Sequence, residues 1–283
     1  MKALLPAAVF TLMVSVGMSL QLRELVANWR QLTWGQWLRL LLATFLAPAG
    51  VALILARVFS LSLPNTAALF MLGATPGAPL LTRKLARRGF DMQVAASYQV
   101  WSGVMTPVMI PVMFFLAAKL YERTIWIPPR ILIVQIAEKE FLPLAVGMLL
   151  MHLAPAFSKK VQGGLNLLGN AVLTLVIVLL LWKMGPQLAA VTPGLVAAAF
   201  LLLVASVGVM PLLMRADSVI VRTFAVSNAN RHVGLVLLLM GRFKRGPETL
   251  PVIASYAILV ALMVAISPRI FRPRELAAKQ ATA

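Results

Sequence analysis

The side chains best suited to chemistry lie in one polar run inside an apolar stretch near residues 223–240. Five of its six residues are polar, and the run reads Ser227-Asn228-Ala229-Asn230-Arg231-His232. Their hydroxyl, amide, guanidinium and imidazole groups can bind an ion or a polar solute. An arginine at the centre of a bilayer costs about 2.5–3.5 kcal/mol on insertion scales, so we expect a cavity, a partner or a function to retain it. The alternative is an interfacial loop that is polar without binding anything.

A second apolar stretch, near residues 65–82, is interrupted by helix-breaking residues in the run Gly73-Ala74-Thr75-Pro76-Gly77-Ala78-Pro79. Pro76 cannot donate a backbone hydrogen bond, and Gly77 adopts dihedral angles that other residues avoid. Pro79 suits the first turn of a new half-helix, which we expect to run through residues 80–86. The N–H groups at such a helix start favour an anion. An ordinary proline kink is the alternative.

The two breaks are more informative as a pair, because one lies in each half of the chain. Backbone that breaks its helix at bilayer depth must be satisfied by protein or by a water-filled cavity. Paired breaks of this kind indicate the central binding site of a transporter. Gln99 and Ser102, in the next apolar stretch, either face the breaks or only hydrogen-bond between helices. The candidate substrate- or ion-binding residues are Thr75, Pro76, Gly77, Thr82, Gln99, Ser102, Ser227, Asn228, Asn230, Arg231 and His232.

The composition is that of an integral membrane protein, since 61% of the residues are hydrophobic and only 12% are charged. Soluble domains average about 25% charged residues. With no cysteine, two histidines and eight acidic residues, the chain offers neither disulfides nor thiolate metal sites, and we expect no resident cofactor and no enzyme centre. The net charge of +18 is interpreted as loop cations that set topology, not as a nucleic-acid surface.

Apolar runs of about 17–25 residues can span a bilayer, and they predict an all-α protein with one membrane transport domain over residues 1–283. The two breaks fall in the third and eighth runs, an odd number apart, so equivalent helices would cross in opposite directions. We therefore expect inverted core repeats at about 40–118 and 193–267, and a panel at about 4–20 and 131–182. The nine expected spans are 4–20, 40–56, 65–82, 92–118, 131–153, 164–182, 193–214, 223–240 and 250–267.

The distribution of cations predicts how the chain sits in the cell (inner) membrane. More of them fall on the side that holds Arg83–Arg88 than on the side that holds Lys119–Arg130. The richer side is expected to be cytoplasmic, which places the N-terminus outside and the C-terminus inside. A cleaved signal peptide is the alternative interpretation of residues 4–20, although a clear cleavage site is missing there.

Beyond these physical arguments, the chain resembles the bile acid:sodium symporter family of the bile/arsenite/riboflavin transporter superfamily. Thr75-Pro76-Gly77-Ala78 is similar to the family's Cys-Pro-Gly-Gly crossover, and Thr106-Pro107 to its Ser-Pro. Gly234-Leu235 closes the second crossover motif, and residues 16–20 loosely resemble a Met-Gly-Leu-x-Leu segment. The resemblance implies two crossing broken helices plus a panel, alternating access, and organic anions as substrates. The family's ten helices imply that this chain has a nine-helix form that lacks the first.

The chain departs from the family at the implied ion sites. The family's Ser-Asn after the first crossover corresponds to Leu81-Thr82, its glutamate to Ser227 and its glutamine to Arg231. We therefore hypothesise that Arg231 is a fixed surrogate cation that attracts the anion, with transport independent of sodium or linked to protons through His232. A sodium-coupled anion symporter is the alternative, and a passive channel or structural subunit is the alternative of another class. Arsenite efflux relatives use a cysteine, which is absent.

Overall fold

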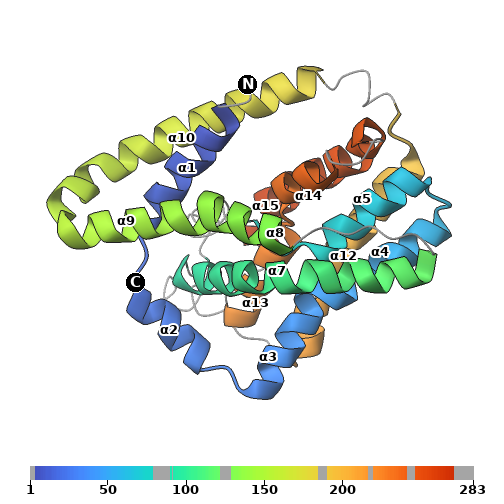
Figure 1. The fold of residues 1–283 in the computed structure, drawn as a ribbon, viewed down its shortest axis with the longest axis horizontal. Coiled ribbons are helices and arrows are strands. Elements are labelled where there is room, and N and C mark those ends of the chain that lie inside the picture. The colour runs from blue at the N-terminus through green and yellow to red at the C-terminus, as the bar shows by residue number, and fades with distance from the viewer. Residues whose placement is uncertain are drawn as a thin grey trace.

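The computed structural model describes residues 4–78, 90, 92–121, 129–183, 190–215, 219–240 and 246–270 (Figure 1). Throughout these residues the regular elements are helices, and none is a β-strand. The predicted all-α membrane fold agrees with this. Among the described residues, three helical stretches are long and apolar enough to cross a membrane, namely Trp34–Val58, Met92–Leu116 and Pro193–Met214. The bent pair Ala7–Gly17 and Leu22–Arg30, at 79°, would make a fourth.

The helices form a three-helix group and a larger core, and α2 and α3 connect the first helix to that core. The first elements are α1 (Leu4–Gly17), α2 (Leu22–Arg30), α3 (Trp34–Leu41), the π-helical turn η1 (Leu42–Leu46), α4 (Ala47–Val58), α5 (Leu63–Ala74) and α7 (Met92–Tyr121). The later ones are α8 (Pro129–Ile136), the π-helical turn η3 (Ala137–Phe141), α9 (Leu142–Leu153), α10 (Pro155–Lys183), α12 (Pro193–Met214), α13 (Val219–Ala229), α14 (Val233–Met240), the 3₁₀ turn η4 (Gly246–Thr249) and α15 (Leu250–Ile270).

The three-helix group consists of α1 packed between α9 and α10, and Figure 1 shows it to one side of the other helices. Close packing at its centre depends on glycine. A Cβ atom on Gly147 would lie 2.1 Å from the carbonyl oxygen of Val14, so α1 and α9 meet backbone to backbone. Ser15, Ser19 and Gln162 add hydrogen bonds between α1 and α10.

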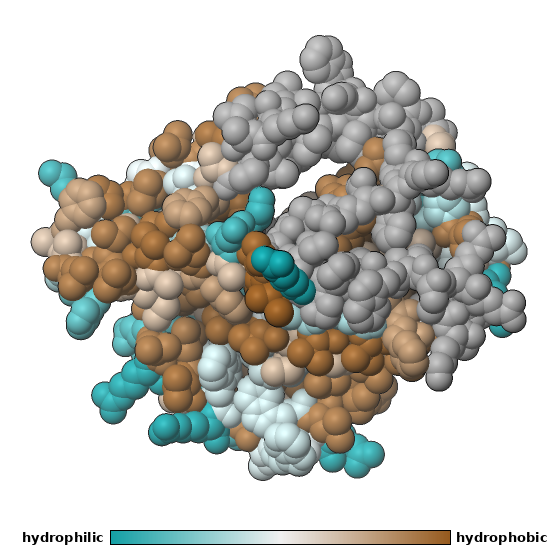
Figure 2. Space-filling view, in the orientation of Figure 1, coloured by the Kyte–Doolittle hydropathy of each residue, from teal (hydrophilic) through white to brown (hydrophobic). Residues whose placement is uncertain are grey.

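The core is built from α4, α5, α12, α13, α14 and α15, with α7 packed against it. Leu69, Leu72, Leu202 and Val236 lie in one buried cluster that joins residues from both halves of the chain. The outer surface is also apolar: Leu153, Leu167 and Leu212 are 70–73% exposed. Figure 2 shows hydrophobic side chains over most of the coloured surface on its face, with hydrophilic ones around the edges and in one small group near the centre. Exposed apolar surface on this scale is typical of contact with lipid.

Candidate functional site

The structure brings the two sequence breaks into direct backbone contact. Gly77 and Arg231 form an isolated antiparallel bridge. The amide of Ala78 donates to the carbonyl of Asn230, and the amide of His232 donates to the carbonyl of Pro76 over 2.9 Å. Each interrupted segment thus supplies partners that the other lost when its helix ended, as burial in an apolar medium requires. We call residues 75–78 together with residues 228–232 the crossing.

Glycine at position 77 is required by how closely the segments approach. A Cβ atom there would lie 2.1 Å from the carbonyl oxygen of Ser227 and 3.2 Å from the Tyr98 ring. Because the nearest atom is backbone, it cannot move aside as the end of a flexible side chain could. Any side chain at position 77 would therefore push the two breaks apart.

Arg231 lies at the centre of the crossing and is only 1% exposed. Its Nη1 donates to the carbonyls of Thr44 at 2.7 Å and Thr75 at 2.8 Å. Its Nε and Nη2 donate to the hydroxyl of Ser206 at 3.3 and 3.1 Å. The Tyr256 hydroxyl neighbours both Arg231 and Ser206. Arg231 forms no ion pair with any carboxylate in the described part of the chain, so oxygen dipoles alone hold this charge.

Local chain geometry explains why these carbonyls are free. In an α-helix the carbonyl of Thr44 would accept from residue 48, but Pro48 has no N–H. The carbonyl of Ala43 also loses its usual partner, because in the π-helical turn the amide of Ala47 donates to Leu42 instead. The carbonyl of Thr75 follows the last residue of α5, at the negative end of the helix dipole. Three helix irregularities therefore create acceptors for the crossing.

Asn228 is fully buried, and both polar atoms of its side chain have hydrogen-bond partners. Its Nδ2 donates to the carbonyls of Ala43 at 3.1 Å and Ser206 at 2.9 Å. Its Oδ1 accepts from the Tyr98 hydroxyl at 2.8 Å, and that hydroxyl lies 3.2 Å from Oγ1 of Thr44. Asn228 thus joins α13 to helices of both halves of the core, and both N–H donors of its side chain are already used in this conformation.

The remaining polar residues of the second break differ in burial. Asn230 and His232 are half-buried, and Nδ2 of Asn230 lies 3.5 Å from the carbonyl of Ala78. Nδ1 of His232 accepts from the amide of Leu235 at 3.1 Å, so the imidazole caps the start of α14 and carries no proton on Nδ1. Oγ of Ser227 is buried and has no hydrogen-bond partner in the structure.

The other candidates lie in different surroundings. Thr75 is buried, and its hydroxyl donates to the carbonyl of Leu72, while Pro76 and Gly77 form the crossing itself. Nε2 of Gln99 lies 3.9 Å from the sulfur of Met13, where α7 meets α1, and the Ser102 hydroxyl donates to the carbonyl of Gln99. Thr82 and the half-helix expected over residues 80–86 lie outside the described residues.

Four contributors to the crossing were not among the sequence candidates, namely Thr44, Tyr98, Ser206 and Tyr256. Each is a buried residue with a hydroxyl inside a helix that is otherwise largely apolar. Hydroxyl-bearing side chains within largely apolar helices were the available signal. For Thr44, a proline four residues further on strengthens that signal, because the proline frees the Thr44 carbonyl.

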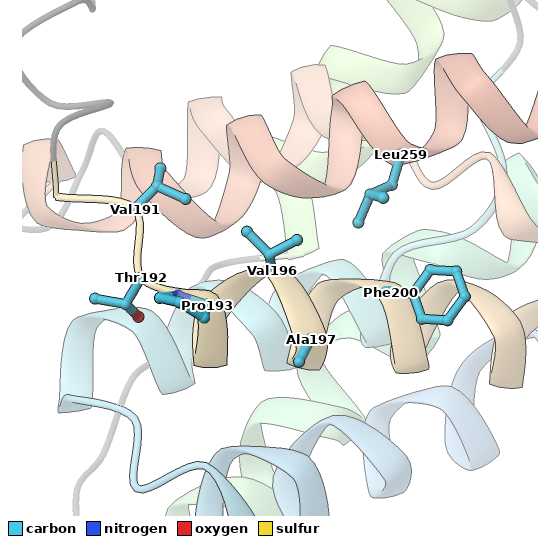
Figure 3. A pocket seen from close by; sticks show the side chains of 7 residues that line it. All are labelled: Val191, Thr192, Pro193, Val196, Ala197, Phe200 and Leu259. Atoms are coloured by element: carbon cyan, nitrogen blue, oxygen red, sulfur yellow. The ribbon is translucent and has the colours of Figure 1, made fainter.

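An apolar hollow opens elsewhere on the surface, between the start of α12 and α15 (Figure 3). It contains none of the residues of the crossing, and its lining is apolar except for one threonine. It is therefore a poor match for a polar solute. Its lining residues are Val191, Thr192, Pro193, Val196, Ala197, Phe200 and Leu259.

Comparison with known proteins bears on the identity of this fold. A search of curated proteins gave no match. The model of the sodium bile acid symporter family matches residues 6–191, which is more than half of the 283 residues. The matched range contains the first break and ends before the second. With its helical fold and spans long enough to cross a bilayer, the chain belongs to the sodium bile acid symporter family and is a multi-pass membrane protein that transports a solute.

Proposed function

We propose that this protein is a secondary active transporter that moves a small organic anion by alternating access. The observation that carries the proposal is the charge at the crossing. Arg231 is buried there, with no carboxylate partner among the described residues, so the centre of the core has an uncompensated positive charge. At an effective dielectric of about 20, a unit charge about 4 Å away contributes roughly 4 kcal/mol. That field favours an anion and opposes a free cation.

The less buried side of the crossing is the proposed anion site. Asn230 and His232 supply hydrogen-bonding groups there, beside the start of α14. A helix start adds a partial positive charge, although the amides of Val233, Leu235 and Val236 in the first turn of α14 already donate to protein acceptors. In this conformation the N–H groups of Arg231 are occupied by protein oxygens, so Arg231 would act on the anion through its field and not by direct contact.

A pairing of side chains that recurs in both halves of the chain supports the expected inverted repeats. Thr44 belongs to the first helix of the first repeat, and its hydroxyl neighbours that of Tyr98 in the repeat's third helix. Ser206 belongs to the first helix of the second repeat and neighbours Tyr256 in its third helix. The same hydroxyl–tyrosine pairing thus occurs in each half around the crossing. In this proposal the two halves form the moving core, and the group of α1, α9 and α10 is the panel against which it rocks.

Counterflow in proteoliposomes tests the function. Vesicles preloaded with an unlabelled organic anion should accumulate the labelled anion against its gradient, whereas a channel gives no such trans-stimulation. A panel of small carboxylates, sulfonates and conjugated steroid anions covers the substrate class, with neutral analogues as controls. Arg231→Gln, which keeps polarity and removes charge, should weaken anion uptake sharply. Uptake of neutral analogues as fast as that of anions would contradict the proposal.

The sodium-coupled symporter is the second candidate, and it is favoured by the family to which the chain belongs. A sodium site at depth usually needs several oxygens and a carboxylate, yet no acidic residue occurs between Asp217 and Glu248. We propose that anion transport here needs no sodium and that any coupling ion is a proton. Replacing sodium by potassium at constant ionic strength decides between the two candidates, since a strict sodium requirement would favour the second.

A further inference from the structure

The surroundings of the Arg231 guanidinium resemble the coordination shell of a cation more than an ordinary arginine contact. Its acceptors are two backbone carbonyls and one hydroxyl, from Thr44, Thr75 and Ser206. Carbonyl and hydroxyl oxygens are the ligands that replace the hydration shell of hard cations in proteins. The usual partner of a buried arginine, a carboxylate, is absent from the described neighbours.

The three acceptors belong to separate elements that share this one charge. Thr44 lies in η1, Thr75 at the end of α5, and Ser206 in the middle of α12. Two of these come from the first half of the chain and one from the second. The guanidinium therefore bridges the two halves by attraction to oxygen dipoles, and without a cation at this point the three oxygens would lose the donor that they share.

We propose that the Arg231 guanidinium is a tethered resident cation, and that removing its side chain leaves an oxygen-lined site that takes a free guanidinium ion or a small monovalent cation. Because the chain carries its own cation, the core is assembled without one from solution. This inference deepens the proposed function. What it implies for ion coupling rests on that function. The cation site itself is tested independently of transport.

The test is the thermal unfolding of purified protein in detergent. Arg231→Ala should lower the Tm by about 5 °C or more, because it removes the donor that three buried oxygens share. Guanidinium at about 20 mM, far below the molar concentrations that denature, should recover at least half of that loss. Arg57→Ala, an exposed arginine near the end of α4, is the matched control and should show neither the loss nor the recovery.

Urea separates charge from shape, because it is the neutral isostere of guanidinium. Recovery by guanidinium, or by sodium or lithium, with none from equimolar urea supports a cation site. Equal recovery by urea and guanidinium, or recovery by none of these solutes, overturns it.

Wild-type protein keeps the proposal testable if Arg231→Ala does not fold. Its site is filled, so its Tm should not change when sodium replaces potassium or a bulky organic cation at constant ionic strength. A saturable rise in the wild-type Tm with sodium would overturn the proposal. These thermal readouts involve no transported anion, so failure of the cation site and failure of anion transport can be told apart.

Discussion

The carbonyl oxygen of Thr44 lies 2.7 Å from Nη1 of Arg231, although the two residues are 187 positions apart in the chain. The contact exists because Pro48 cannot supply the N–H that would occupy this carbonyl within a regular helix. A proline in one half of the chain thus leaves a carbonyl free to accept from an arginine in the other half. The crossing depends on such irregularities at least as much as on its polar side chains.

Substituting Pro48 by alanine should weaken the crossing. The new N–H can donate to Thr44 and close a regular helical turn, so Arg231 would lose one acceptor. Hydrogen bonds to charged groups contribute about 1.5–3 kcal/mol, and we expect a loss of stability of about that size. The measurement is the Tm in detergent. Pro193→Ala, in the first turn of α12, is the control and should change little, since helix starts need no such N–H. An unchanged Tm for Pro48→Ala would contradict this account.

Substituting Gly77 by alanine should separate the two breaks, because the new Cβ would lie 2.1 Å from the Ser227 carbonyl. We expect a lower Tm and loss of solute uptake in proteoliposomes. Gly163→Ala makes the same change in α10, where a Cβ meets no atom within 4 Å. That control should retain activity and gain up to about 1 kcal/mol from better helix propensity. If both variants behaved alike, close packing at position 77 could not be the cause.

Tyr98→Phe should destabilise the core by leaving Oδ1 of Asn228 without its donor at 2.8 Å. A buried acceptor that loses its partner costs about 1–3 kcal/mol. Tyr256→Phe should cost less, because the Ala229 carbonyl that accepts from its hydroxyl over 2.6 Å also accepts from the amide of Arg231 at 3.0 Å. A double-mutant cycle checks the first pair: Tyr98→Phe should cost less in an Asn228→Ala background. Strictly additive losses would show that the two side chains are not coupled.

The membrane orientation stays a prediction from the cation distribution, and cysteine labelling can test it. The wild-type chain contains no cysteine, so single cysteines can be introduced without removing others. An impermeant thiol reagent applied to intact cells should label a cysteine at Tyr121 and spare one at Ala86. Permeabilised cells, in which both should react, provide the control for reactivity. Labelling at Ala86 alone in intact cells would reverse the assignment.

The crossing could be predicted from sequence because its two segments carry strong local signals. Pro76 and Gly77 break a helix wherever they stand, and Arg231 within an apolar stretch needs an explanation at bilayer depth. Two such interruptions at matched positions indicated that they would meet, and the bridge between Gly77 and Arg231 bears this out.

The acceptors of Arg231 could not be read from sequence in the same way. Two of them are backbone carbonyls, which every residue has, and only the local hydrogen-bonding pattern makes those of Thr44 and Thr75 free. Gln99 shows the opposite error, in which a residue is predicted at the site but lies elsewhere. An amide suits a binding site, yet the amide of Gln99 lies near Met13 of α1. Which neighbour a helix faces depends on the packing of several helices together, and hydropathy does not encode it.

A cysteine pair at Ala78 and Asn230 gives the most direct test of the crossing. These residues follow and precede the bridged pair, and the Ala78 amide donates to the Asn230 carbonyl. Residues opposite each other in antiparallel backbone have Cβ atoms about 4.5–5.5 Å apart, within reach of a short bifunctional thiol reagent. Both positions are half-buried, so the reagent can reach them more readily than the buried Thr75 and Ala229. The linked peptides should be detected by mass spectrometry after digestion. Ala78 paired with a cysteine at Asn170, in α10, is the control and should give no link in the conformation described here. Absence of the 78–230 link in folded protein, with and without a transported anion, would mean that the two breaks do not meet.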